Sequence, residues 1–259
     1  MRYVLEHQDE ADRLEFQATI PQYSIKDETA TLDIPKNAKV LDAGCGTGVL
    51  ARYVKHQFPD AEVHGFDYSE LRVSEANKRN KETHNKITFF HDNIEKLDIP
   101  ENSYDVVVSR YVIEHLPNPQ AAIKELYRVL KPGGKLFIID FDGIFINLFS
   151  TNARFNELLE QIKSGFKSDL YVGRKLPAYF HQAGFKNIDY DVTAVQFKGE
   201  NAEMEYENNH KRCLNCQVEF ARILGSEKLA EEFAALYLKE SIKPGSVLFY
   251  NKFIVSGIK

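Results

Sequence analysis

The chain has 259 residues, 43 % of them hydrophobic, with 33 basic and 38 acidic side chains and a formal net charge of −5. This length suits one α/β domain with an elaboration, or at most two small domains, and the composition excludes a disordered chain. The acidic balance disfavours a nucleic-acid partner bound through a broad basic surface. No segment approaches a membrane span or the apolar core of a signal peptide, and the three cysteines form no even framework. We therefore expect a cytoplasmic protein.

Residues 1–34 precede the first expected strand and contain one amphipathic helix at about 9–19. From residue 39 onward, short apolar runs alternate with stretches that have helical spacing. The expected strands are 39–43, 61–67, 86–92, 104–109 and 135–141, and the expected helices are 47–58, 69–82 and 119–130. Ser69 is a candidate N-cap of the second helix. Such alternation predicts a parallel, doubly wound sheet with helices on both faces.

The C-terminal third breaks this alternation. Two long strands, 186–197 and 246–257, flank a charged stretch, 199–243, that is typical of two helices separated at Gly225 and Ser226, and Ser226 is a candidate N-cap of the second helix. The whole pattern predicts one domain with a seven-stranded sheet, mostly parallel, that ends in an antiparallel C-terminal hairpin. Its core is 37–198 and 244–259, its helical insertion is 199–243, and residues 1–34 form an N-terminal helical segment. That segment could be a packing helix, but we predict that it is a lid over a ligand at the carboxyl ends of the strands, which orders when the ligand binds.

A glycine loop, "VLDAGCGTGVL" at 40–50, follows the first strand, with glycines two apart at 44, 46 and 48. The dinucleotide fingerprint G-x-G-x-x-G would instead place its third glycine at 49, where valine stands. A glycine loop alone is equally compatible with a structural turn. Asp67, however, ends the second strand about 20 residues beyond the loop, where a carboxylate can accept hydrogen bonds from ribose hydroxyls. Asp92 follows the third strand and could accept from the amine of an adenine.

Several motifs together carry a family resemblance: "VLDAGCGTG", "FDYS", the segment 91–140, and "AGF" at 183–185. In order and spacing they resemble class I S-adenosylmethionine-dependent methyltransferases, most closely the ubiquinone and menaquinone biosynthesis type and its small-molecule relatives. The resemblance covers roughly 37–190 and is weak over 199–243. It implies a Rossmann-like fold, S-adenosylmethionine as cofactor with S-adenosylhomocysteine as product, and a small-molecule methyl acceptor.

The resemblance also implies which residues bind the cofactor. Gly44, Cys45 and Gly46 would lie at its methionine end and Asp67 at the ribose, while Tyr68, Asp92, Asn93 and Ile94 would surround the adenine and Ser109 and Arg110 would line the pocket near the methionine. Asp42 either fixes the loop or faces the ammonium of the cofactor. From the N-terminal segment, Tyr3 and Arg13 could close over the cofactor, although both are equally compatible with ordinary surface.

The identity of any catalytic residue stays open, because the sulfonium of the cofactor is already activated. A base is needed only where the accepting atom arrives protonated. Tyr111, Glu114 and His115 follow the fourth strand, where the acceptor should approach, and a purely structural role is the alternative for each. Tyr171 and Arg174 could also line the pocket, or lie in a solvated loop.

The pair Cys213 and Cys216 has only His210 as a nearby further ligand, so we expect buried packing and no metal site. The rival functions are a nicotinamide-dependent dehydrogenase, which the loop spacing disfavours, a non-catalytic cofactor-binding module with a partner-binding insertion, and a protein or RNA methyltransferase. The acceptor, the oligomeric state and the role of the insertion are not determined by the sequence.

Overall fold

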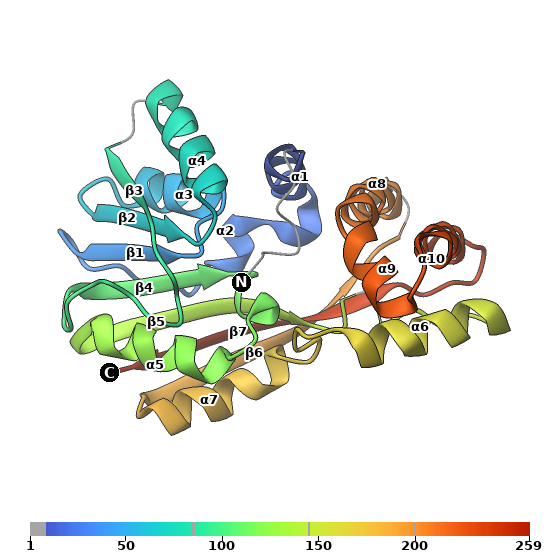
Figure 1. Ribbon diagram of the computed structural model, residues 1–259. Helices are drawn as coiled ribbons and strands as arrows, with labels where there is room; N and C mark the ends of the chain where they lie inside the picture. Colours follow the sequence, from blue (N-terminus) through green and yellow to red (C-terminus); the bar gives the residue numbers. More distant parts are fainter. Residues whose placement is uncertain (1–8, 84–85, 145, 199) are drawn as a thin grey trace. The chain divides into compact units, whose positions relative to one another are not determined.

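The computed structural model describes residues 9–83, 86–144, 146–198 and 200–259. Its centre is a seven-stranded sheet in the order β3-β2-β1-β4-β5-β7-β6 (Figure 1). The strands are β1 Lys39–Ala43, β2 Glu62–Asp67, β3 Ile87–His91, β4 Tyr104–Arg110, β5 Leu130–Asp142, β6 Lys186–Gln196 and β7 Phe249–Ile258. The first five pair in parallel. At the far end of β7, Lys259 exchanges backbone hydrogen bonds with Gly133 and Gly134 near the start of β5, which is an antiparallel pairing. The predicted Rossmann-like α/β fold is confirmed.

The helices begin and end close to the positions that the sequence predicts. They are α1 Glu10–Gln17, α2 Ile25–Glu28, α3 Val49–Gln57, α4 Glu70–Thr83, α5 Pro119–Val129, α6 Ala153–Gly165, α7 Leu176–Ala183, α8 Glu200–Asn215, α9 Gln217–Leu224 and α10 Glu227–Ser241. Short 3₁₀ turns are η1 Pro21–Tyr23, η2 Ile113–His115 and η3 Gly173–Lys175. Ser69 Oγ accepts from Arg72 N at 3.3 Å and Ser226 Oγ from Leu229 N at 3.5 Å, so both predicted N-caps lie where expected. Among the described residues, no helix is both long and apolar enough to cross a bilayer.

The insertion contains three helices, where two were predicted. α8 ends at Asn215 and α9 begins at Gln217, without a glycine or proline to mark the break. The backbone N–H of Cys216 still donates to Arg212 and that of Phe220 to Cys216, so the helical hydrogen-bond pattern continues through a kink. Periodicity alone cannot reveal such a kink, because the apolar spacing is nearly unbroken.

The chain forms two compact units. The sheet unit comprises 25–142, 171–193 and 252–259. The helical unit comprises residues 143–170 and 194–251 together with the N-terminal residues up to 24. The sequence analysis assigned 143–170 to the core, whereas the structure groups this segment, which contains α6, with the insertion. The physical reason is that α6 packs its apolar face on α9 and α10.

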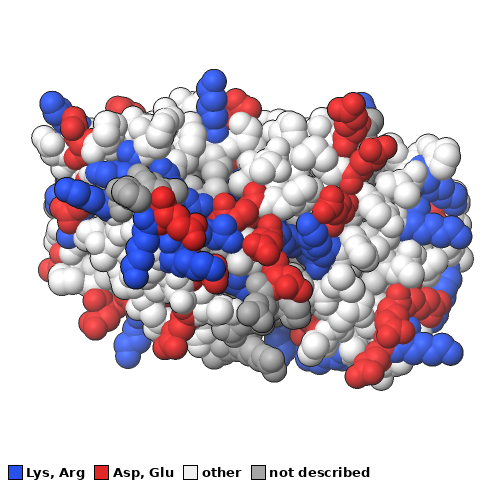
Figure 2. Space-filling model, turned by 90° about the horizontal axis from the view of Figure 1, so that it is seen from above, with Lys and Arg blue, Asp and Glu red and all other residues white. Residues whose placement is uncertain are grey.

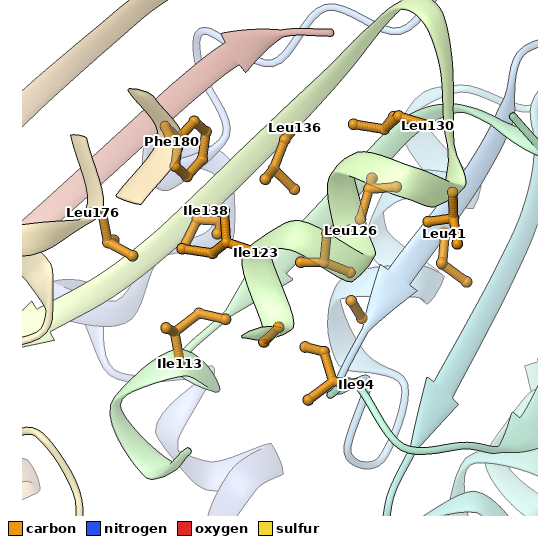
Figure 3. Packing of buried hydrophobic residues seen from close by; sticks show 14 of the residues in the cluster. Leu41, Ile94, Ile113, Ile123, Leu126, Leu130, Leu136, Ile138, Leu176 and Phe180 are labelled. Atoms are coloured by element: carbon orange, nitrogen blue, oxygen red, sulfur yellow. The ribbon is translucent and has the colours of Figure 1, made fainter. Parts of the chain in front are cut away.

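The hydrophobic core of the sheet unit lies between the sheet and the helices α5 and α7. Leu41, Leu136 and Ile138 project from the strands toward Ile123 and Leu126 of α5, and all of these side chains are fully buried (Figure 3). α5 begins with proline at its first turn and is capped by Asn118, whose side chain accepts from Ala121 N. This packing holds β1, β4 and β5 rigidly, and therefore fixes the loops at their carboxyl ends.

Candidate functional site

The glycine loop is fastened to the end of β2 by backbone and side-chain hydrogen bonds. Gly44 N and Cys45 N both donate to the carbonyl of Phe66, at 2.9 and 2.8 Å. Gly46 N donates to Asp67 Oδ2 at 2.8 Å, and Ser69 N donates to Oδ1 of the same carboxylate at 2.9 Å. Each Asp67 oxygen thus accepts one backbone hydrogen bond and has a second lone pair. The carboxylate is well suited to accept from the two hydroxyls of a ribose.

Glycine is required in this loop because other parts of the sheet unit approach it closely. Gly44 has φ +76°, and a Cβ built there would lie 2.5 Å from Val112 Cγ2. Gly48 has φ +80°, and its Cβ would lie 2.6 Å from Phe89 Cζ. Any other residue at either position would be strained in backbone and would displace a neighbour. Gly48, the third glycine, is therefore the N-cap of α3 in the left-handed conformation. Its position does not indicate a dinucleotide-binding site.

Asp42 at the end of β1 is attached to the helix that follows the loop, and the two roles predicted for it stay predictions. Its Oδ2 accepts from Ala51 N in the first turn of α3 at 3.0 Å. Burial raises the pKa of this carboxyl to about 7, although the Ala51 hydrogen bond opposes the shift. Burial also raises the pKa of the neighbouring Cys45 thiol well above its ordinary range. The thiol therefore stays protonated and unreactive at neutral pH.

The end of β3 is joined to the end of β2. Asp92 N donates to the Asp67 carbonyl at 3.1 Å, and the Asp92 carboxylate accepts from Asn93 N at 2.7 Å and from Asp98 N at 3.1 Å. Asp67 therefore ends β2 and Asp92 follows β3, so both lie at the carboxyl ends of two neighbouring strands. Ile94 is buried in the core cluster (Figure 3) and Tyr68 is 42 % exposed, so their predicted contacts with an adenine stay predictions.

Ser109 and Arg110, at the end of β4, both have well-defined partners. Ser109 is fully buried, and its Oγ donates to the carbonyl of Ala43 at 2.9 Å, which ties β4 to β1 just before the glycine loop. Arg110 Nε donates to Glu28 Oε2 of α2 at 2.6 Å. The Arg110 guanidinium also lies over the ring of Tyr111, 4.2 Å from its centroid.

Glu28 accepts hydrogen bonds from residues that lie far from it in the sequence. It is 2 % exposed and accepts from Arg110, from the hydroxyl of Tyr111, and from Lys252 Nζ of β7. Burial lowers the pKa of Lys252, while Glu28 opposes that shift. Sequence reasoning missed Glu28 and Lys252 because Glu28 lies 82 residues before Arg110 and 224 residues before Lys252. We call Glu28, Arg110, Tyr111 and Lys252 the Glu28 cluster.

The other two catalytic candidates lie in η2, the turn after β4. Asp140 of β5 is fully buried and accepts from Ile113 N at 2.8 Å and Glu114 N at 3.3 Å. Burial raises the pKa of Asp140 to about 7, against the lowering effect of these backbone hydrogen bonds. His115 Nε2 lies 3.6 Å from Glu114 Oε1. Asp140, which the sequence analysis did not select, thus positions the segment that contains both candidates.

Arg13 lies inside the helical unit and is 4 % exposed. Its guanidinium donates to Glu10 through Nε at 2.7 Å and to Asn208 Oδ1 through Nη1 at 3.0 Å. Tyr3 lies outside the described residues. A cofactor contact by either residue stays a prediction.

The remaining sequence candidates have local partners. Arg174 Nε donates to Asp142 at 2.5 Å, and its guanidinium lies 4.8 Å from the ring centroid of Tyr171. Cys213 and Cys216 are buried, and burial raises the pKa of both thiols. Within the described ranges no three His, Cys, Asp or Glu side chains are grouped for a metal ion.

Comparisons with known proteins agree with this geometry. Residues 41–138 match a methyltransferase domain family. Over 118 residues the chain is 33 % identical to a demethylmenaquinone methyltransferase of Listeria welshimeri, covering 44 % of this chain and 50 % of that protein. The chain therefore spans about half the length of this relative.

Two solved structures share the fold. The YcgJ protein from Bacillus subtilis superposes with a TM-score of 0.62 at 18 % identity, covering 92 % of this chain and 98 % of that chain. A Haemonchus contortus phosphoethanolamine N-methyltransferase 2, in complex with phosphomonomethylethanolamine and S-adenosylhomocysteine, superposes with a TM-score of 0.65 at 18 % identity, covering 99 % and 60 %.

The sheet order and the matched segment are those of a Rossmann-like methyltransferase domain. The similarity to demethylmenaquinone methyltransferases and the matched domain support a class I S-adenosylmethionine-dependent methyltransferase. S-Adenosylmethionine is the cofactor of that family, and the Asp67 carboxylate and the glycine loop fit it.

Proposed function

We propose that this protein transfers the methyl group of S-adenosylmethionine to a small molecule. The observation that carries the proposal is the attachment of the glycine loop to Asp67, since a carboxylate held at the end of β2 beside this loop would be able to accept from ribose hydroxyls. The demethylmenaquinone methyltransferase similarity supports a small acceptor of the quinol type. On the face drawn in Figure 2, acidic and basic side chains are interspersed, which offers no broad basic surface there for RNA.

The cofactor, when bound, supplies an electrophilic methyl on a sulfonium, so the protein needs to orient the reactants and exclude water. Asp67 would accept from the ribose hydroxyls, and Asp92 would lie at the adenine. Gly44 and Gly46 would let the backbone approach the methionine end, and the segment after β4 would face the acceptor. The accepting atom forms its bond to the methyl carbon as the carbon–sulfur bond breaks, and that electron pair stays on sulfur.

A labelling experiment tests the proposal. The protein is incubated anaerobically with S-adenosylmethionine labelled in its methyl group and with 1,4-dihydroxynaphthalene, the ring system of a menaquinol. We expect label in the organic extract. Label that appears instead in acid-precipitated protein or RNA, when these are offered, would contradict a small-molecule acceptor, and cofactor binding without any transfer would favour a non-catalytic module.

Asp67→Ala is the matching variant. Loss of a charged hydrogen-bond partner removes about 1.5–3 kcal/mol, which weakens cofactor binding roughly ten- to more than a hundredfold. Asp60→Ala, at an exposed acid of the same unit, is the control and should leave binding unchanged. Equal cofactor affinity in the Asp67 variant and the parent would show that the ribose site lies elsewhere.

A further inference from the structure

Two segments of the helical unit meet and expose apolar side chains. Leu148 and Leu248 form an isolated antiparallel bridge, and both side chains are buried. Phe149 follows the first of them and Val247 precedes the second, so these two residues are opposite each other, with their side chains on the other side of the pair. Phe149 is 73 % exposed and Val247 is 57 % exposed. The two exposed side chains therefore lie side by side.

Ile242 extends this apolar surface to the end of α10. It directly follows the helix and is 55 % exposed. The next four residues form a tight turn, in which Ser246 N donates to the carbonyl of Lys243 at 2.9 Å. The turn brings the chain back, so that Val247 returns to the end of the helix. We call Phe149, Ile242 and Val247 the apolar patch.

The apolar patch is held on a fixed support by Glu240, whose side chain is buried. Its Oε2 accepts from Ser150 Oγ at 2.8 Å, and its backbone carbonyl accepts from Ser246 Oγ at 2.5 Å. These two serines are the chain neighbours of Phe149 and Val247, so both segments are attached to the last turn of α10. Apolar side chains that a fixed support exposes together are typical of an interaction surface.

The exposed charges beside the apolar patch have one sign. Residues 143–153 contain no charged side chain, and residues 241–251 contain only Lys243. Lys239, in the last turn of α10, is exposed, as is Lys243, whose Nζ lies 3.3 Å from the buried Glu240 carboxylate. Among the described residues of these two segments and of this last turn, no acidic side chain is exposed. The patch is therefore bordered by lysines.

This composition favours a lipid bilayer as the occupant. Aromatic and aliphatic side chains enter the boundary between headgroups and acyl chains, while lysines keep their ammonium groups at anionic headgroups. A second copy of the chain fits less well, since a stable interface covers about 800 Å² of each partner and the patch has three side chains. Two-fold contact between copies would also place the lysines of one copy near those of the other.

We propose that the apolar patch, with Lys239 and Lys243, docks the protein on the surface of a membrane that contains anionic phospholipids. The three apolar side chains enter the interfacial region, and the two lysines lie at the phosphates of the headgroups. So small an apolar area gives reversible binding, because stable anchoring needs more buried apolar surface. The docking does not depend on the proposed methyl transfer.

Fluorescence tests where the protein touches the membrane. The chain contains no tryptophan, so Phe149→Trp introduces a single reporter into the apolar patch. On addition of vesicles of equimolar phosphatidylcholine and phosphatidylglycerol, we expect its emission to shift to the blue, because the indole leaves water. Val218→Trp, at an exposed position of α9, is the control and should not shift. A shift at both positions, or at neither, would overturn the proposal.

Cosedimentation with the same vesicles measures the affinity. Phe149→Ser should weaken binding at least about tenfold, because the phenylalanine side chain is no longer buried in the interface. Val218→Ser should leave binding unchanged. Lys239→Gln and Lys243→Gln should each weaken it about fivefold and reduce its salt dependence, whereas Lys228→Gln, in the first turn of α10, should not.

Several results would contradict membrane docking. They are failure of the parent protein to sediment with the vesicles, equal binding to vesicles of phosphatidylcholine alone, and equal effects of the three lysine variants. Analytical ultracentrifugation tests a second copy as occupant: a parent dimer that Phe149→Ser dissociates would assign the apolar patch to contact between copies. Each variant should melt at the temperature of the parent, since every substituted side chain is exposed.

Discussion

The two units of the chain bury polar side chains in different ways. In the sheet unit, the carboxylates of Asp67, Asp92 and Asp140 accept from backbone N–H groups, although Glu28 of the same unit accepts from side chains. In the helical unit, buried polar side chains satisfy one another. A carboxylate that receives one backbone donor at each oxygen can still accept from a ligand, whereas a closed side-chain network specifies how helices assemble. The first arrangement is compatible with the binding site that we propose, and the second with a structural role.

Glu205 of α8 is the centre of the network in the helical unit. Tyr23 and Tyr250 donate to its Oε1 at 2.9 and 3.1 Å, and Asn208 Nδ2 donates to Oε2 at 3.0 Å. Arg212 lies 3.6 Å from the same carboxylate and is 4 % exposed. Burial, followed by the charge of Glu205, raises the pKa of both tyrosines, so their hydroxyls stay protonated and continue to donate.

The largest expected effect is the loss of this central charge. Glu205→Gln leaves the Arg212 guanidinium buried without its counter-ion, and breaking a buried pair in this way costs about 3–5 kcal/mol of unfolding free energy. Glu207→Gln, in the same helix, removes the exposed partner of Lys211 and should cost less than about 1 kcal/mol. Urea unfolding measures both variants. Equal stabilities would mean that the network does not hold the helical unit together.

A second expected effect concerns pH and the sheet unit. Because burial raises the Asp42 pKa from 3.8 to about 7, the folded protein binds a proton there that the unfolded chain releases. Its contribution to stability is fully present below about pH 4 and is lost as the pH rises toward 7, by up to about 4 kcal/mol. Asp42→Asn should make this part of the profile less steep, as measured by unfolding at pH 4 to 8, while Asp140, whose pKa burial also raises to about 7, keeps its own contribution.

Asp105 provides a control of opposite sign. Partial burial would raise its pKa, but hydrogen bonds from Lys131 and from the backbone of Lys39 outweigh burial and lower it. Its stabilising contribution is therefore present above about pH 4 and is lost at lower pH. Asp105→Asn should change the acid limb of the stability profile and leave the region from pH 5 to 8 unaltered. A change at neutral pH in this variant would undermine the assignment to Asp42.

A third, smaller difference separates two glycines with the same backbone conformation. Gly44→Ala incurs left-handed strain and also a clash with Val112, whereas Gly133→Ala, at φ +80°, has nothing within 4 Å of the new Cβ. Overpacking adds about 1–3 kcal/mol, so the first variant should be less stable by that amount. It should also lose affinity for S-adenosylhomocysteine, which the second should keep. Equal affinities would mean that close approach at Gly44 is irrelevant to binding.

The smallest expected effect is at α1. Its Arg13 is already paired with Glu10 and Asn208 inside the helical unit, so S-adenosylhomocysteine should change the amide protection of residues 10–17 little. Hydrogen exchange with and without this ligand makes the comparison. A large gain in protection would instead support the lid that the sequence analysis predicted for residues 1–34.

The features that the sequence predicted share a physical property: each depends on neighbours in the chain. The glycine loop, the carboxylate that ends β2 and the caps Ser69 and Ser226 follow from local turn, strand and capping rules. Glu28 and Lys252 could not be selected, because their chemistry arises only when α2 and β7 meet the end of β4. The mutual pairing in the helical unit escaped prediction for the same reason, since Tyr23 is 182 residues from Glu205.

Calorimetric titration with S-adenosylhomocysteine and with NAD tests the central claim most directly, because the two ligands share an adenosine and differ in the group attached to it. A site built for a nucleoside-bearing sulfonium should bind S-adenosylhomocysteine, which should also raise the melting temperature, and NAD should give no saturable heat. Tighter binding of NAD, or thermal stabilisation by NAD alone, would contradict the account.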